Sequence, residues 1–290
     1  MGNVGKAVVE VYRHDVKVRM PTGKQSGGGK RKAVREFSRA SRTNLLFTTF
    51  NAHADWKAFL TLTYPSDFPS NGREVKAHLN TFLAAMRFKV EKETGKEFKY
   101  MWALEWQERG APHYHLLVES FVPHQWLARE WFNVVQSGDA KHFKAGTSVE
   151  ACDDEKTGAY YMVKHYGAKS KQKKVPTEYL NVGRMWAASR KLARPVKIGE
   201  VDIRTPGGKF VVRTLRRYTE SKAKPKRVRP IYGKRLNQET GEIENVQRKR
   251  AVNRPVRLPN LRGQAGRHHD FAGFKSFNGA AIASRLLESA

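Results

Sequence analysis

The sequence contains little cysteine and little acidic charge. Cys152 is the one cysteine among 290 residues, which excludes an intramolecular disulfide framework and a zinc site built from several cysteines. The 27 aspartates and glutamates are outnumbered by 55 lysines and arginines, so the formal net charge is +28. A charge of this size requires a polyanionic partner, and nucleic acid is the first candidate.

Long apolar runs are also missing. The longest stretch without a charged residue, Thr43 to Ala54, is much shorter than the roughly 20 residues of a membrane-spanning helix. The first residues lack the apolar core of a signal peptide. No Gly-x-x-x-x-Gly-Lys-Ser/Thr motif occurs, which argues against a fused nucleotide-driven helicase. We therefore expect no membrane association, a cytoplasmic location and a separate partner for DNA unwinding.

Composition divides the chain into three parts. Residues 1–45 are basic and include the run Gly27 to Lys32, which predicts a flexible basic arm. Residues 46–218 alternate between strand and helix patterns and predict a folded domain with a C-terminal add-on. Residues 219–290 are rich in lysine, arginine, proline and glycine, which predicts a basic, largely disordered tail with a short helix near 280–287.

The middle part predicts the order β-α-β-β-α-β-α. The expected elements are strand 59–64, helix 74–93, strands 99–107 and 113–120, helix 124–136, strand 147–152 and helix 156–169. The first six elements match the ferredoxin-like split βαβ arrangement, an α+β fold with an antiparallel sheet and helices on one face. Further on, residues 179–191 predict a helix, and 196–203 and 210–218 predict an added hairpin.

Three polar residues of the predicted central hairpin suit a divalent cation. His113 and His115 share one face of their strand because side chains alternate along a strand. A turn centred on Gly110 would place Glu105 opposite His115, within about 5 Å. Two imidazoles and a carboxylate leave coordination positions open, and a phosphate substrate favours Mg²⁺ or Mn²⁺. Taken alone, each of these residues is typical of an ordinary sheet surface.

A tyrosine of the last predicted helix is the candidate nucleophile. On a helix, Tyr161 shares a face with Lys164 and His165, three and four residues later. A phenol beside a metal and a lysine can attack a phosphodiester, with Lys164 offsetting charge in the transition state. The alternative is that Tyr160, Tyr161 and Tyr166 are packing residues, the usual role of tyrosines in helices.

These residues resemble the three ordered motifs of HUH endonucleases. The motifs are Phe59 to Thr63, Glu105 with Gly110 to His115, and Tyr161 to Lys164. The set is most similar to the rolling-circle replication initiators of small single-stranded DNA bacteriophages and plasmids. Gly183 to Trp186, followed by Ser189-Arg190, resembles a later segment of the phage members, so the resemblance covers roughly residues 58–192.

The resemblance implies a site-specific single-strand DNA endonuclease and ligase that acts on origin DNA in a bacterial host. It assigns His113, His115 and Glu105 as metal ligands and Tyr161, accompanied by Lys164, as the nucleophile. The reaction would leave a 5′-phosphotyrosine link and a free 3′-hydroxyl, for a host DNA polymerase and helicase to use. Some phage initiators carry a second tyrosine four residues after the first. Here that position is His165, which favours a single nucleophile.

Two alternatives remain open from the sequence. An HUH transposase would use the same chemistry on a transposon-end hairpin. In relaxases the tyrosine precedes the histidines, whereas Tyr161 follows them, as it does in replication initiators and related transposases. A non-catalytic nucleic-acid-binding protein would explain the charge and the fold, but it would leave the Glu/His/His face and the pairing of Tyr161 with Lys164 without a role.

Overall fold

The computed structural model describes residues 8–14, 16–19, 33–153, 155–166, 174–190, 192, 195–210, 213 and 227–252. Two predicted features lie outside these residues: the run of glycines and basic residues at 27–32, and the helix expected near 280–287. The chain divides into two compact units. The larger unit spans residues 26–198 together with 12–15, and it contains every candidate site residue.

The larger unit is built on a five-stranded antiparallel sheet. Its elements are α1 (Arg39–Asn51), β3 (Ala58–Thr63), α2 (Gly72–Thr94), β4 (Tyr100–Trp106), β5 (Pro112–Val118), α3 (His124–Val135), α4 (Ala140–Ala145), β6 (Thr147–Ala151), α5 (Glu155–Tyr166), the 3₁₀-helix η2 (Thr177–Tyr179) and β7 (Trp186–Ala188). The strand order is β6-β3-β5-β4-β7. Without β7, this is the ferredoxin-like order, so the predicted α+β class is confirmed.

Helix α2 shows how the sequence sets an element's ends and its buried face. The Asn71 side chain caps the helix by accepting a hydrogen bond from the backbone N–H of Arg73 at 2.8 Å. Gly95 ends the helix with a φ of 65°, in the left-handed region that favours glycine. The buried residues recur at helical spacing, at Val75, Leu79, Phe82, Leu83, Met86 and Val90. This apolar stripe fixes the side of α2 that faces the sheet.

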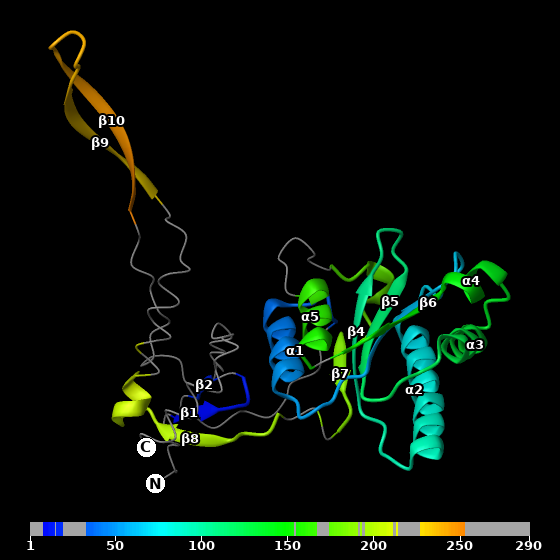
Figure 1. The fold of residues 1–290 in the computed structure, drawn as a ribbon. Coiled ribbons are helices and arrows are strands. Elements are labelled where there is room, and N and C mark those ends of the chain that lie inside the picture. Colours follow the sequence, from blue (N-terminus) through cyan, green and yellow to red (C-terminus); the bar gives the residue numbers. More distant parts are fainter. Residues whose placement is uncertain are drawn as a thin grey trace. The chain divides into compact units, whose positions relative to one another are not determined.

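The sheet separates two layers of helices (Figure 1). Helices α2 and α3 cover one face, on which the Tyr114 hydroxyl donates a hydrogen bond to the Val75 carbonyl at 3.2 Å. Helices α1 and α5 cover the other face, where Thr49 of α1 lies 3.0 Å from the Met101 sulfur. The sequence analysis expected the two helices among its first six elements on one face. Helix α1 was not expected, and the proposed domain boundary at residue 45 falls inside it.

The segment after α5 differs from its predicted helix. Residues 179–191 contain the end of η2 and the short edge strand β7. β7 pairs with β4, so that Trp186 lies opposite Ala103 and Ala188 opposite Met101. The hydrogen bond from the Leu104 N–H to the Met185 carbonyl, at 2.8 Å, extends this pairing. Pairing along an open sheet edge therefore decides the conformation here, rather than local helical propensity.

The smaller unit combines strands from the N-terminal region with a strand that follows the larger unit in the sequence. β1 (Val8–Val11) pairs with β2 (Val16–Arg19) and with β8 (Gly199–Asp202), so part of the expected N-terminal arm is a strand. The first strand of the predicted hairpin is present as β8, but it pairs with β1. Residues 206–210, which include the expected turn, are helical, and most of the expected second strand lies outside the described residues.

The region 219–290 contains two strands that the sequence analysis did not expect. β9 (Arg227–Leu236) and β10 (Ile243–Val252) form a two-stranded antiparallel ribbon. In its register Arg229 lies opposite Arg250, Arg227 opposite Val252, and Ile231 opposite Arg248. Residues 253–290 lie outside the described part of the chain.

Candidate metal centre and tyrosine helix

The hairpin of β4 and β5 brings the candidate ligands onto one face, but in a register other than the predicted one. Glu105 lies opposite His113, and Ala103 lies opposite His115. Gly110, with a φ of 82°, donates a hydrogen bond to the Gln107 carbonyl at 2.9 Å and closes the turn. The register differs by two residues from the prediction. A two-residue shift keeps every side chain on its predicted face, so Glu105 and His115 still converge.

The contact between Glu105 and His115 is close and largely shielded from water. Oε1 of Glu105 lies 3.4 Å from Nε2 of His115, and the two side chains are 13% and 2% exposed. The other ring nitrogen of His115, Nδ1, lies 3.3 Å from the Thr61 hydroxyl of β3. Burial lowers the pKa of His115, although the hydrogen bond to Glu105 opposes the shift. The lowered pKa favours the neutral ring, which is the form that binds a metal.

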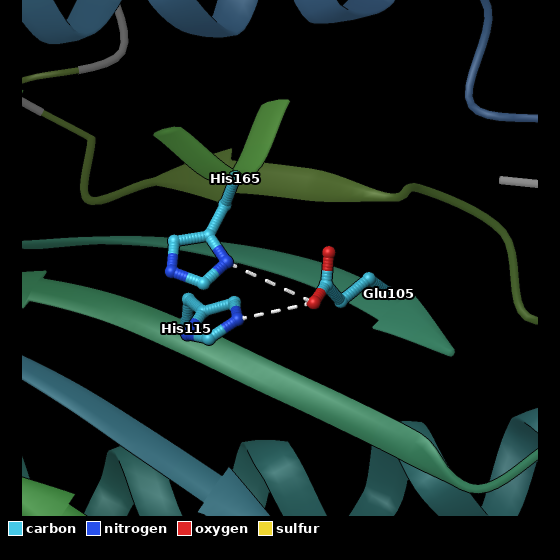
Figure 2. Close-up of side chains that lie close together, drawn as sticks. All are labelled: Glu105, His115 and His165. Atoms are coloured by element: carbon cyan, nitrogen blue, oxygen red, sulfur yellow. Dashed lines mark hydrogen bonds and ion pairs between the residues drawn. The ribbon is translucent and has the colours of Figure 1, made fainter. Parts of the chain in front are cut away.

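His165 of α5 completes a three-residue cluster that the sequence analysis did not assign as a ligand set. Its Nδ1 lies 3.9 Å from Oε1 of Glu105, and its ring centroid lies 4.0 Å from that of His115. One potential ligand atom from each of these three residues lies within 4.8 Å of the others (Figure 2). The spacing of His165 four residues after Tyr161 was the available signal, because it puts both on one helical face.

His113 lies next to this cluster and outside it. Its ring centroid is 4.5 Å from that of His115, and its Nδ1 lies 3.0 Å from the Thr63 hydroxyl. The three-residue group is made of Glu105, His115 and His165. The role of His113 as a ligand therefore stays a prediction.

The cluster has the chemistry of a divalent-cation site. Carboxylate oxygen and neutral imidazole nitrogen are ligands for Mn²⁺ and related metals, and Mg²⁺ prefers the oxygen ligands among them. His165 Nδ1 is buried and makes no hydrogen bond within the described part of the chain. A buried, unsatisfied nitrogen facing a carboxylate is unfavourable by itself, and a bound cation would satisfy both groups. The residues present therefore fit a metal ion.

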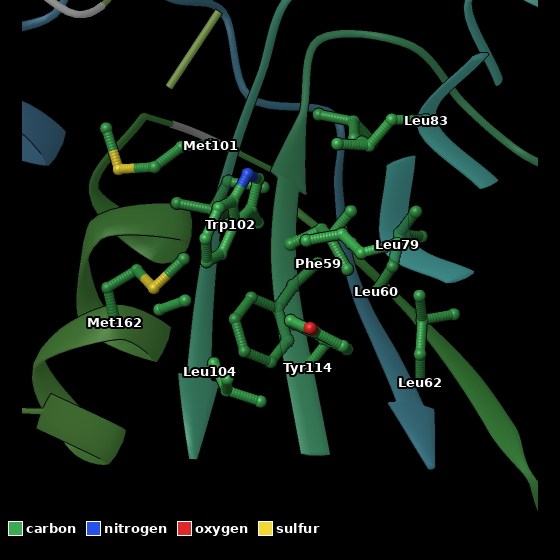
Figure 3. Packing of buried hydrophobic residues seen from close by; sticks show 14 of the residues in the cluster. Phe59, Leu60, Leu62, Leu79, Leu83, Met101, Trp102, Leu104, Tyr114 and Met162 are labelled. Atoms are coloured by element: carbon green, nitrogen blue, oxygen red, sulfur yellow. The ribbon is translucent and has the colours of Figure 1, made fainter. Parts of the chain in front are cut away.

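The Phe59 ring of β3 connects the cluster to Tyr161. It stacks against the rings of three residues, and the distances between ring centroids are 5.1 Å to His115, 4.8 Å to Tyr161 and 5.7 Å to His165. On the same helix, the fully buried Met162 extends the packing of α5 against the sheet (Figure 3). The helix with the candidate nucleophile thus lies over the metal-site face.

Tyr161 is partly exposed, whereas a neighbouring tyrosine is not. The hydroxyl of Tyr161 is hydrogen-bonded to the Glu150 carboxylate of β6, and this contact is the main reason that the pKa of Tyr161 is raised. Tyr166 is 2% exposed, and burial raises its pKa well above the usual value. Lys164 is exposed, and the side chain of Tyr160 is outside the described part of the structure. Tyr161 is therefore more accessible to a substrate than Tyr166.

The described residues contain no helix that combines the length and the apolar character needed to cross a membrane. No curated protein and no solved structure matched the chain. Residues 57–172 match the model of the family described as Replication-associated protein ORF2/G2P. The matched segment runs from the start of β3 to just beyond α5, so it contains Glu105, His115, Tyr161 and His165. This segment of the chain is similar to the replication-associated protein ORF2/G2P family.

Proposed function

We propose that this protein nicks single-stranded origin DNA by tyrosine attack and so initiates rolling-circle replication. The observation that carries the proposal is the packing of α5 over the Glu105–His115–His165 cluster. This packing brings a partly exposed tyrosine and three potential metal ligands to one face of the sheet. A protein that only bound DNA would need neither the buried ligand group nor a tyrosine beside it. The net charge of +28 supports binding of the DNA backbone.

In this proposal Glu105, His115 and His165 hold Mg²⁺ or Mn²⁺, with His113 as a further candidate ligand. A bound divalent cation would polarise the non-bridging oxygens of the scissile phosphate. Thr61 fixes the ring of His115 through a contact of 3.3 Å with its Nδ1 and leaves Nε2 facing Glu105. An oriented imidazole of this kind binds metal more tightly than a freely rotating one.

Tyr161 supplies the nucleophile, and Glu150 receives its proton. The phenol oxygen forms a bond to phosphorus while the bond from phosphorus to the 3′-oxygen breaks. The products are a 5′-phosphotyrosine and, once the departing 3′-oxygen takes up a proton, a free 3′-hydroxyl. The effect of Glu150 on Tyr161, which raises the pKa of the phenol through a side-chain hydrogen bond, supports this proton transfer because it makes Glu150 an acceptor for the phenol proton. The exposed Lys164 would offset negative charge on the phosphate.

The free 3′-hydroxyl would prime synthesis by a host DNA polymerase. Attack of a 3′-hydroxyl on the phosphotyrosine reverses the first step and rejoins the strand, which accounts for ligation by the same site. The sequence has no motif for nucleotide-driven unwinding, so the proposal requires a helicase from the host.

The test is to incubate the protein with circular single-stranded DNA and Mn²⁺ or Mg²⁺, followed by denaturing electrophoresis. We expect a covalent protein–DNA species with the wild-type protein and with Tyr166→Phe. We expect none with Tyr161→Phe or in excess chelator. DNA binding without any covalent species, in the presence of either metal, would refute the proposal and favour a non-catalytic DNA-binding protein.

A further inference from the structure

A small cavity lies along the edge strand β7, in a segment that the proposed chemistry does not use. Its volume is about 350 Å³, near the lower end of the roughly 300–1,000 Å³ of typical ligand pockets. The lining residues are Ser41 of α1, Arg184 and Met185 before the strand, and Trp186, Ala187 and Ala188 of the strand itself. The volume suits one planar ring system rather than a folded oligonucleotide.

The cavity lies on the same face of the sheet as the metal cluster. Trp186 is paired with Ala103 of β4, and Ala103 is paired with His115 of β5. Paired residues share a face, and neighbouring strands are about 4.8 Å apart, so the backbone of Trp186 lies roughly 10 Å from that of His115. A DNA strand bound at the metal cluster therefore reaches this cavity within a few nucleotides.

Trp186 is held as a fixed aromatic surface. Its indole N–H donates a hydrogen bond of 3.1 Å to the Ser41 hydroxyl, which sets the orientation of the ring. The residue is only partly buried, although one side of it packs against the core. Because the indole N–H is already hydrogen-bonded and the ring is partly exposed, a ligand would contact the aromatic face of Trp186.

Arg184 adds a cationic group beside this ring. It is exposed and lines the same cavity as Trp186. An aromatic face accepts any base by stacking, and a guanidinium binds phosphate or stacks as a cation. This pair of groups is the combination by which proteins bind unpaired nucleotides.

We propose that the β7 cavity binds one unstacked base of the single-stranded DNA substrate, with Trp186 stacking on the base and Arg184 contacting a neighbouring phosphate. The inference rests on the proposed function for the identity of the substrate. It adds a positioning site that holds the strand in place next to the metal cluster. A base inside a duplex is already stacked on its neighbours, so the site favours single-stranded DNA.

The test separates base contacts from phosphate contacts without knowledge of the origin sequence. Binding of the full-length protein is measured in chelator, which prevents cleavage, to two oligonucleotides of equal length and charge. One is thymidine throughout and the other is abasic throughout. Trp186→Leu keeps an apolar side chain without the ring, and we expect the preference for the thymidine strand to fall by roughly 5- to 150-fold. Trp186→Phe keeps a ring and should retain most of that preference.

Two further variants control the interpretation. Trp126→Leu removes a comparable partly buried tryptophan, which has the Lys89 Nζ 5.2 Å from its ring, on the other face of the sheet. It should leave the preference unchanged. Arg184→Gln should weaken binding of both strands by a similar factor, because it removes a phosphate contact.

A preference for thymidine that is unchanged in Trp186→Leu, with circular dichroism matching that of the wild type, would overturn the inference. If Trp186→Leu does not fold, photocrosslinking of the wild-type protein to a 5-iododeoxyuridine strand decides. A crosslink on Trp186 supports the site, and a crosslink map without Trp186 overturns it. These readouts do not require nicking, so failure of the nuclease proposal would be seen separately in the adduct assay.

Discussion

Replacement of Phe59 by leucine tests whether its ring aligns the tyrosine helix with the metal cluster. Phe59 is 1% exposed, and its ring stacks against His115, Tyr161 and His165 at 4.8–5.7 Å between centroids. Leucine keeps most of the apolar burial and removes all three ring contacts. An aromatic pair contributes about 0.5–1.5 kcal/mol beyond its buried area, and contacts that share one ring add less than in full. We therefore expect Phe59→Leu to lower the free energy of unfolding by about 1–3 kcal/mol.

The assay combines urea unfolding with the rate of covalent adduct formation. Phe82→Leu is the matched control, since Phe82 is fully buried on α2 and its ring meets Trp131 at 5.8 Å on the other face of the sheet. Both variants should lose stability, whereas only Phe59→Leu should slow adduct formation while DNA affinity is retained. Equal adduct rates in the two variants, under conditions where both are folded, would show that Phe59 has only a packing role.

The other predictions concern the metal cluster and the tail. His115→Ala and His165→Ala should each reduce Mn²⁺ binding in calorimetry by at least tenfold, and undiminished binding would remove that residue from the ligand set. The same measurement on His113→Ala decides whether His113 is a ligand. Because the pKa of His115 is lowered from 6.5, the unfolded chain binds more protons than the folded one below that pH. The metal-free protein should therefore lose stability as the pH falls below 6.5, and a flat profile in urea unfolding would contradict this. If about 6–10 phosphates are neutralised, DNA affinity should fall roughly 10³- to 10⁵-fold between about 50 and 200 mM salt, and deletion of residues 221–290 should make this dependence shallower.

The sequence predicted the helices and strands that are marked by patterns of neighbouring residues, such as an apolar stripe, an end signal or side-chain alternation. The apolar stripe and the end signal at Gly95 located α2 to within two residues at each end. The alternation in β4 and β5 correctly assigned both faces of the hairpin. Its register was not predictable to the residue, because the turn depends on the hydrogen bond from Gly110 to Gln107, which the sequence does not reveal.

Elements that depend on distant contacts were missed. β1 pairs with β8, although residues 8–11 and 199–202 lie far apart in the sequence, with most of the larger unit between them. The helix α1 buries Thr48 and Thr49, polar residues that weaken its apolar pattern, and the Thr49 hydroxyl is satisfied by the Leu45 carbonyl at 2.9 Å. The β9–β10 ribbon was missed because the basic composition of this region predicted disorder. Its turn is local: Gly241 has a φ of 70°, and its N–H donates a hydrogen bond to the Asn237 carbonyl.

The sequence predicted that the candidate site would combine a carboxylate with histidines, but it did not identify His165 as a member. Side-chain alternation was enough to bring Glu105 and His115 together, because it depends only on position in a strand. The approach of His165 depends on how α5 packs across the sheet, and the contact of Tyr161 with Glu150 depends on the pairing of β6 with β3. Both are tertiary arrangements that no local pattern encodes.

The most direct measurement for the central claim is peptide mapping of the covalent adduct. The wild-type protein is incubated with single-stranded DNA and Mn²⁺, digested with nuclease and protease, and the modified peptide is sequenced by mass spectrometry. We predict a nucleotide on Tyr161, since this tyrosine is partly exposed, stacks on Phe59 and contacts Glu150. A nucleotide on Tyr160 or Tyr166 would contradict the assignment of the nucleophile and of the helix face that meets the metal cluster.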